Sequence, residues 1–228
     1  MKKRTVVISL GGSLIVPDDI DLNFLKKFRD LIIRHTNKYK FVIVCGGGSI
    51  ARKYISALKE NKSSSYLQSL AGISVTRLNA IFMSYFFFKD QSGGIPHDME
   101  HIKNLLQKHD VVFCGALRYA PNQTSDSTAV KLATFLKTDF INLTNVKGLY
   151  NKNPMQYRDA KFIPKATISE FNKIVMAIPF KPGMHAPVDH TAMKIIKQHK
   201  IKTYILGKDT NQLNNLLNNK RFIGTTIS

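Results

Sequence analysis

The stretch Phe41–Arg52, FVIVCGGGSIAR, decides how this chain folds. Phe41–Val44 is apolar and rich in β-branched residues, as expected of a strand buried on both faces. Three consecutive glycines follow, and Ser49–Leu58 has the composition of a helix. Glycine lets the backbone approach a ligand closely, and amides at a helix N-terminus attract anions. The stretch predicts a strand, a phosphate-binding turn and a helix whose Arg52 can contact phosphate oxygens.

Two other predicted strands end in small residues in the same way. Thr5–Leu10 runs into Gly11-Gly12-Ser13, and Val111–Cys114 runs into Gly115-Ala116. If these strands are parallel, the three turns meet at one carboxyl edge of the sheet, where open α/β sheets bind ligands. The turns match neither a Walker A loop nor a Rossmann fingerprint.

Strands and helices alternate along the rest of the chain. Further strands are expected at Phe140–Leu143, Thr203–Leu206 and Gly224–Ile227, and further helices near Asp21, Asp98, Ser125, Thr167 and Asp189 and over 66–88 and Asn211–Leu217. Asp98 and Asp189 are predicted N-caps, and Thr167 with Glu170 fits a capping box. The alternation predicts an α/β fold with a mainly parallel sheet between two helix layers. No linker or repeat divides residues 1–228, so one domain is expected.

The composition is strongly basic, with 34 Lys+Arg against 15 Asp+Glu and a formal charge of +19. A polyanionic partner such as RNA is one interpretation. The favoured one is a solvated lysine-rich surface around a site for small anions, because the cations are scattered along the sequence. Cys45 and Cys114 are expected to be small buried residues without a disulfide, which favours a cytoplasmic location.

The segment 66–88 is long for a helix and carries many large apolar residues: Leu67, Leu70, Val75, Leu78, Ile81, Phe82, Tyr85 and Phe86. Core packing is the expected role for most of them. A subunit interface is the alternative, because the segment exceeds the usual helix length.

The whole chain resembles the amino acid kinase superfamily and, within it, the archaeal-type UMP kinases. The resemblance rests on the order of VVISLGGSLIVPDD, CGGGSIARKYI, GISVTRLNA, TSDSTAVKLATFLKTD, LTNVKGLYNKNP, VDHTAMKII and the closing GTTI. It implies a three-layer αβα sandwich that transfers the γ-phosphoryl group of MgATP to UMP. It also implies a homo-oligomer, a hexamer built as a trimer of dimers, with an acceptor half at about 1–125 and an ATP half at about 126–228.

The resemblance also implies the roles of individual residues. Arg52, Asp126 and Gly12 would be catalytic. ATP would be bound by Gly11, Gly12, Ser13, Gly48, Arg52, Thr144, Asn145, Tyr150 and Asn153. UMP would be bound by Gly47, Ser69, Leu117, Arg118, Tyr119, Ala120, Pro121, Asn122, Gln123 and Thr124. No protein residue is assigned to a metal, and Mg²⁺ is expected to arrive with ATP.

Several positions depart from the family pattern. Ser9 stands where many members have a lysine on the first strand, and Ser49 stands where a lysine is common after the glycines. Ser69 replaces an acceptor-side aspartate, and Lys147 and Asn153 replace aspartates near ATP. The residues expected to bind the triphosphate largely match the family pattern, whereas those expected to bind the acceptor mostly differ from it. Lys181 is one candidate for the missing cation.

Alternative interpretations therefore stay open. A kinase of the same fold for another small anion is one, although an isopentenyl-phosphate-type kinase would want a histidine near Arg52 and a carboxylate kinase a lysine at Ser9. A weakly catalytic nucleotide- or RNA-binding protein is another. Asp126 alone would be an ordinary first-turn helix charge, Tyr150 a core aromatic, and His185 and His190 structural.

Overall fold

The computed structural model describes residues 3–88, 94–120, 123–178 and 187–228. Its main sheet has seven strands in the order β3-β2-β1-β4-β8-β9-β7. β1 (Arg4–Leu10), β2 (Tyr39–Cys45), β3 (Val111–Cys114), β4 (Phe140–Leu143) and β8 (Thr203–Leu206) are parallel neighbours. β9 (Thr225–Ile227) is antiparallel to β8, and β7 (Lys165–Ala166) is parallel to β9. β5 (Leu149–Tyr150) and β6 (Phe162–Ile163) form a separate antiparallel pair.

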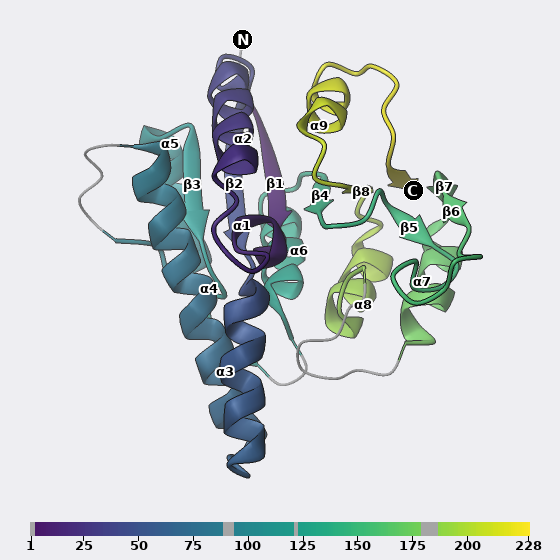
Figure 1. Ribbon diagram of the computed structural model, residues 1–228. Helices are drawn as coiled ribbons and strands as arrows, with labels where there is room; N and C mark the ends of the chain where they lie inside the picture. The colour runs from purple at the N-terminus through teal and green to yellow at the C-terminus, as the bar shows by residue number, and fades with distance from the viewer. Residues whose placement is uncertain (1–2, 89–93, 121–122, 179–186) are drawn as a thin grey trace.

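Helices cover both faces of the sheet (Figure 1). One layer contains α1 (Gly12–Ile15), α2 (Leu22–His35), α4 (Ser65–Phe87) and α9 (Thr210–Leu217). The other contains α5 (Met99–Lys108), α6 (Ser125–Phe135), α7 (Ile168–Met176) and α8 (His190–His199). The expected three-layer αβα sandwich with a mainly parallel sheet is confirmed.

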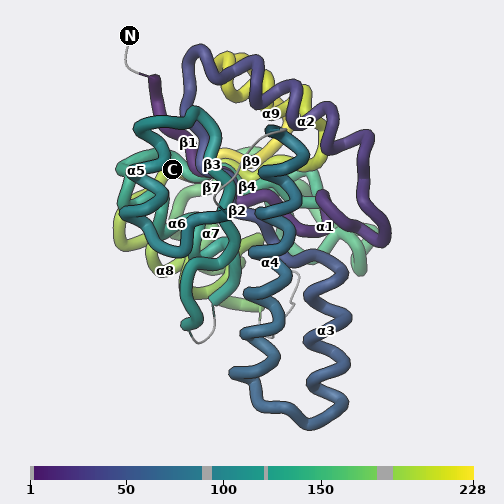
Figure 2. The backbone as a smooth tube through the Cα atoms, turned by 90° about the vertical axis from the view of Figure 1, so that its left-hand side faces the viewer, coloured from purple at the N-terminus to yellow at the C-terminus, as the bar shows by residue number. Residues whose placement is uncertain are grey.

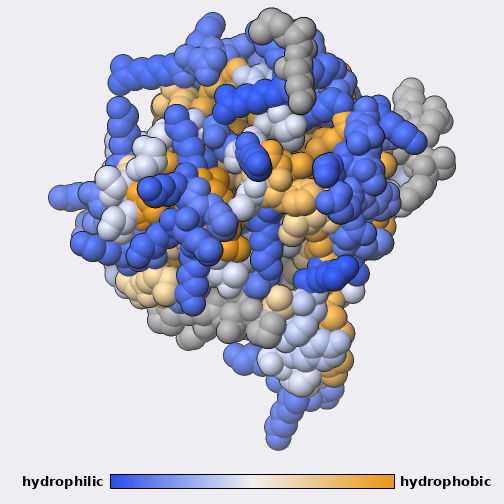
Figure 3. Space-filling model, turned by 180° about the vertical axis from the view of Figure 1, so that it is seen from behind, coloured by the Kyte–Doolittle hydropathy of each residue, from blue (hydrophilic) through white to orange (hydrophobic). Residues whose placement is uncertain are grey.

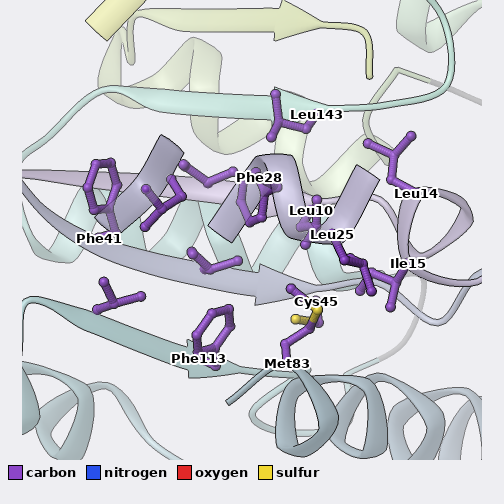
Figure 4. Packing of buried hydrophobic residues seen from close by; sticks show 14 of the residues in the cluster. Leu10, Leu14, Ile15, Leu25, Phe28, Phe41, Cys45, Met83, Phe113 and Leu143 are labelled. Carbon is purple, nitrogen blue, oxygen red and sulfur yellow. The ribbon is translucent and has the colours of Figure 1, made fainter. Parts of the chain in front are cut away.

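Alternate residues of the central strands feed the two cores. On β1, Val6, Ile8 and Leu10 pack under α2 and α4, whereas Val7 faces the α6 and α8 layer. This is the period of two that a strand imposes on its side chains. Figure 4 shows the first core, in which Phe28 of α2 lies over the strands and Met83 of α4 points toward Cys45.

The sequence located the long elements well. The expected strands lie within two residues of the observed ones. Asp98 and Asp189 accept a hydrogen bond from their helices as N-caps, and Thr167 with Glu170 forms the capping box. α1 and the two-residue strands β5, β6 and β7 were missed, because elements this short carry no readable periodicity.

The expectation for the long helix α4 is met in part. Of its eight large apolar residues, Val75 is buried and Ile81, Phe82 and Phe86 are partly buried against the core, whereas Leu67, Leu78 and Tyr85 are exposed. The buried face consists mainly of small or polar residues, namely Gln68, Thr76, Asn79, Ala80 and Ser84 together with Val75, Met83 and Phe87. Asn79 and Thr76 of that face bond to backbone groups of two turns, whereas Met83 and Phe87 pack in the core.

α3 (Gly48–Glu60) and the first turns of α4 form an antiparallel pair that projects from the rest of the molecule (Figure 2). By length and composition α4 would also pass as a membrane span, the one such helix in the described part of the chain. Apolar core helices pass the same test, and one face of α4 packs on β2 and β3. The helix therefore serves as part of the fold.

Replacing Phe28 by Ala should lower the free energy of unfolding by about 3–5 kcal/mol, because this fully buried ring contacts Phe24 and Phe87 and would leave a cavity. Urea denaturation measures the loss. Ile33 on the same helix is 43% exposed, and Ile33→Ala should change stability by less than about 1 kcal/mol. Equal losses in the two variants would contradict the packing described here.

Candidate functional site

Two glycine turns touch each other backbone to backbone at the carboxyl ends of β1 and β2. A Cβ atom on Gly12 would lie 2.1 Å from the Gly48 nitrogen and 2.6 Å from the Gly46 oxygen. Gly48 also has φ of +64°, a conformation that side chains disfavour. The two turns that the sequence singled out are therefore in direct contact.

Hydrogen bonds fix these turns to the sheet. The Gly11 N–H donates to the Leu143 carbonyl of β4 at 2.9 Å, and the Gly46 N–H donates to the Leu10 carbonyl at 2.9 Å. The third turn follows β3, which runs parallel to β2 with Cys114 opposite Val44, and it lies against α4, where a Cβ on Gly115 would meet the Arg77 nitrogen at 2.6 Å. The prediction that all three turns share one edge of the sheet is confirmed.

A cleft of about 1200 Å³ opens at this edge. Nearly all the residues assigned from the sequence line it: Gly11, Gly12, Ser13, Gly47, Gly48, Arg52, Ser69, Arg118, Tyr119, Ala120, Gln123, Thr124, Asp126, Thr144, Asn145, Tyr150 and Asn153. The volume is in the range of a ligand site or larger. One continuous cleft thus brings together residues predicted for two different ligands.

Some predicted residues lie elsewhere. The Leu117 side chain is buried in the core beside α6, and its carbonyl accepts a hydrogen bond from Arg77. Pro121 and Asn122 lie outside the described residues, as do Lys181 and His185. The structure therefore says nothing about Lys181 as the missing cation.

The cleft is positively charged. Among the described residues that line it, Arg52, Arg118, Lys152 and Lys173 are cationic and Asp126 is the one acid. Lys152 pairs with Asp159 at 2.5 Å, whereas no carboxylate of the described residues lies within ion-pair distance of Arg52 or Arg118. Two arginines without a carboxylate partner among the described residues, in a cleft lined by glycine turns, suit a ligand with several phosphates.

Asp126 lies in the first turn of α6, half-buried at the wall of the cleft. The Ser9 hydroxyl of β1 donates to its carboxylate at 2.7 Å. Desolvation by burial raises the pKa of Asp126 to about 7, helped by the negative charge of Asp189 and opposed by the Ser9 hydrogen bond. Ser9, at the position where many members of the resembled family have a lysine, thus contacts the carboxylate directly.

Asp189 ties two helices together at the cleft. It caps α8, accepting from the Ala192 N–H, and also accepts from the backbone and hydroxyl groups of Thr124 and Ser127 on α6. It is 2% exposed. Five donors around one buried carboxylate fix the start of α6, and with it the position of Asp126.

At the predicted acceptor end of the cleft, the lining residue Tyr119 packs against Tyr66. The Tyr66 and Tyr119 rings meet edge to face, with centroids 4.8 Å apart. Ser69, one turn along α4 from Tyr66, donates its hydroxyl hydrogen to the Ser65 carbonyl at 2.8 Å. The hydroxyl that replaces the family's carboxylate is therefore engaged within its own helix.

The cysteines and His190 have structural environments, as expected. Burial raises the pKa of Cys114 to about 12 and raises that of Cys45 well above its ordinary value, so neither thiol is a nucleophile. Both are free and buried. The His190 ring is within 2.7 Å of the Ile178 carbonyl.

Sequence reasoning missed part of the lining. Lys173, Ile174, Ala177 and Ile178 reach the cleft from α7 and the residues after it, and Gln156 and Tyr157 reach it from the loop after β5. The spacing of the α7 residues fits one helical face, but nothing in that spacing indicates which layer the face meets. The roles of Thr76, Arg77 and Asn79, inside the quoted motif GISVTRLNA, were also missed.

The sequence profile of the amino acid kinase family matches residues 4–207. The chain belongs to this family. It is 32% identical to the uridylate kinase of Thermococcus kodakarensis over 89% of this chain and 90% of that one. It is 33% identical to the uridylate kinase of Thermoplasma volcanium over 98% and 97%. The crystal structure of uridylate kinase from Archaeoglobus fulgidus superposes with a TM-score of 0.82 at 29% identity, covering 98% of this chain and 99% of that chain.

Replacing Asp126 by Asn should change how the free energy of unfolding depends on pH. The folded protein holds the Asp126 proton more tightly than the unfolded chain, where the pKa is 3.8. The carboxyl therefore stabilises the fold fully below about pH 4, and this contribution is lost as pH rises to about 7. Asn resembles the protonated form, so the stability of the variant relative to wild type should rise between pH 5 and pH 8.

Each pKa unit corresponds to about 1.4 kcal/mol, and solvent reaching a half-buried group reduces the effect, so the expected gain is on the order of 2 kcal/mol. Urea denaturation at both pH values measures it. Asp30→Asn at an exposed carboxylate of α2 is the control and should show no such gain. A difference that stays constant with pH would contradict the raised pKa.

Proposed function

We propose that this chain is a UMP kinase, which transfers the γ-phosphoryl group of ATP to UMP and releases UDP and ADP. The observation that carries the proposal is the contact between Gly12 and the Gly46–Gly48 turn inside one cationic cleft. Two phosphate-binding turns in contact let two nucleotides meet phosphate to phosphate. The resemblance to uridylate kinases along nearly the whole chain supports the choice of UMP.

In this proposal the cleft has two ends. ATP lies toward Thr144, Asn145, Tyr150 and Asn153, in the half from about residue 126 onward. UMP lies toward Ser69, Tyr119 and the N-terminus of α3, in the half up to about residue 125. The phosphates meet at the glycine turns, where the α3 N-terminus favours negative charge.

Direct in-line transfer needs little covalent chemistry from the protein, because phosphoryl transfer depends on positioning and charge stabilisation. The turn amides of Gly12 and Gly48 would hold the group in transit, and the Arg52 guanidinium would neutralise its oxygens. Asp126 would hold the β1 turn through Ser9 and keep the start of α6 beside the phosphates.

Mg²⁺ fits this site as a partner of ATP. The described residues contain no cluster of three metal-ligating side chains, and Asp126 is the one carboxylate among those lining the cleft. The ion would be held mainly by phosphate oxygens and water, with Asp126 as the nearest acid. When bound, it would neutralise the charge that develops on the phosphates.

The surface charge does not require a nucleic-acid partner. Figure 3 shows hydrophilic side chains spread over the back of the molecule with small apolar areas between them. The ligands proposed here are small anions, and the protein would act in the cytoplasm, where both nucleotides occur. Salt-dependent RNA binding without phosphoryl transfer would favour the alternative instead.

A coupled assay of ADP release, with UMP, CMP, AMP and GMP as acceptors, tests the proposal. UMP should be the preferred acceptor with MgATP.

Arg52→Ala should lower kcat by about 100-fold, because it removes a cation at the transferring group. Lys53→Ala, at the exposed neighbour on α3, should keep kcat within about twofold. If the wild type does not phosphorylate UMP, the proposed function is refuted. If it phosphorylates another acceptor instead, that acceptor defines its substrate.

We also propose a homo-oligomer, a hexamer built as a trimer of dimers. The exposed apolar side chains of α4, Leu67, Leu78 and Tyr85, support an association through this helix, because a monomer would leave them in water. Sedimentation velocity should give a hexamer, and Leu78→Lys with Tyr85→Lys should give smaller species. A wild-type monomer at micromolar concentration would rule this assembly out.

A further inference from the structure

The inner face of α4 carries three polar residues, Thr76, Arg77 and Asn79, that bond to turns rather than to other side chains. We call these three residues the α4 brace. Asn79 is 4% exposed and donates from its amide nitrogen to the Gly46 carbonyl at 2.7 Å. The Gly46 N–H donates on its other side to Leu10. The first glycine of the triple turn is thus held from both directions.

The same face of α4 also holds the third turn. The Ala116 N–H donates to the Thr76 hydroxyl oxygen at 2.9 Å, and that hydroxyl donates to the Ile73 carbonyl. Arg77 donates through Nε to the Ala116 carbonyl at 3.0 Å and through its terminal nitrogen to the Leu117 carbonyl at 2.6 Å. Three hydrogen bonds therefore fix three consecutive peptide groups.

The two turns that the brace joins have different positions in the cleft. The Gly46 turn leads into Gly47 and Gly48, beside Gly12, and the Ala116 turn leads directly into Arg118 and Tyr119 at the acceptor end. Both turns follow strands that pair with each other, β2 and β3, but the turns themselves are not joined by a strand ladder. One rigid helix therefore fixes the distance between the place for an acceptor phosphate and the place for the rest of that molecule.

We infer that the α4 brace is the positioning element of the acceptor site: it sets the spacing between the phosphate turn and the loop that contacts the acceptor nucleoside. This inference rests on the proposed function. The brace does not touch the ATP end, so its loss should affect the two substrates unequally. A purely structural role would instead lower stability and impair both substrates together.

Thr76→Val tests this, because it removes the hydroxyl and keeps the side-chain shape. KM for UMP should rise about tenfold with loss of the buried hydrogen bond, while KM for ATP should stay within about twofold. Thr76→Ser keeps the hydroxyl and should restore wild-type values. Arg77→Lys, which loses the fork of two donors, should act like Thr76→Val.

Ser74→Ala is the matched control, since this exposed hydroxyl of the same helix bonds only to Leu70 among the described residues. It should leave both KM values unchanged. Equal changes of KM for UMP and ATP in Thr76→Val, or no change in either, would overturn the inference.

Amide hydrogen exchange separates this inference from the proposed function, because it needs no turnover. In the ligand-free protein, the Ala116 amide should exchange at least about tenfold faster in Thr76→Val than in wild type or Ser74→Ala. If UMP is not a substrate but this exchange accelerates, the proposed function fails and the bracing of the turn stands. Unchanged exchange would overturn the inference whatever the enzyme's activity.

Discussion

The backbone contact between Gly12 and the Gly46–Gly48 turn is the constraint on which the rest of the structure depends. β1 and β2 are adjacent and parallel, with Leu10 paired to Cys45, so the two turns emerge side by side. They can touch because neither carries a side chain at the contact, and a Cβ on Gly12 would overlap the Gly48 nitrogen. The absence of side chains leaves main-chain amides facing the cleft, which is what phosphate binding requires.

This contact also explains the unusual character of α4. The helix runs beside two turns, and Thr76 and Asn79 of its buried face bond to their peptide groups. Buried backbone groups outside a strand ladder need such partners. Leu67, Leu78 and Tyr85 of α4 are exposed, and a second subunit could cover them. One face of α4, a helix that the sequence predicts to pack in the core, thus also holds the turns of the site in place.

The cleft carries no cation at Ser9, the position on β1 where many members of the family have a lysine. Desolvation by burial raises the pKa of Asp126 to about 7, and the hydrogen bond from Ser9 offsets only part of this rise. Positive charge comes instead from Arg52 on α3, Arg118 on the acceptor loop and Lys173 on α7. These groups line the cleft, where they can attract anionic ligands.

The sequence by itself determined the long strands, the helix caps and the glycine turns, because these depend on local rules: apolar runs, capping side chains and residues without a Cβ. Parallel strands then place the turns at one edge, so most of the candidate site followed as well. Only the tertiary structure decided which groups meet across the chain. Asp189 binds Thr124 and Ser127 more than 60 residues away, and Asn79 binds Gly46 across 33 residues. Such partners depend on how helices pack in three dimensions, and no sequence period records that packing.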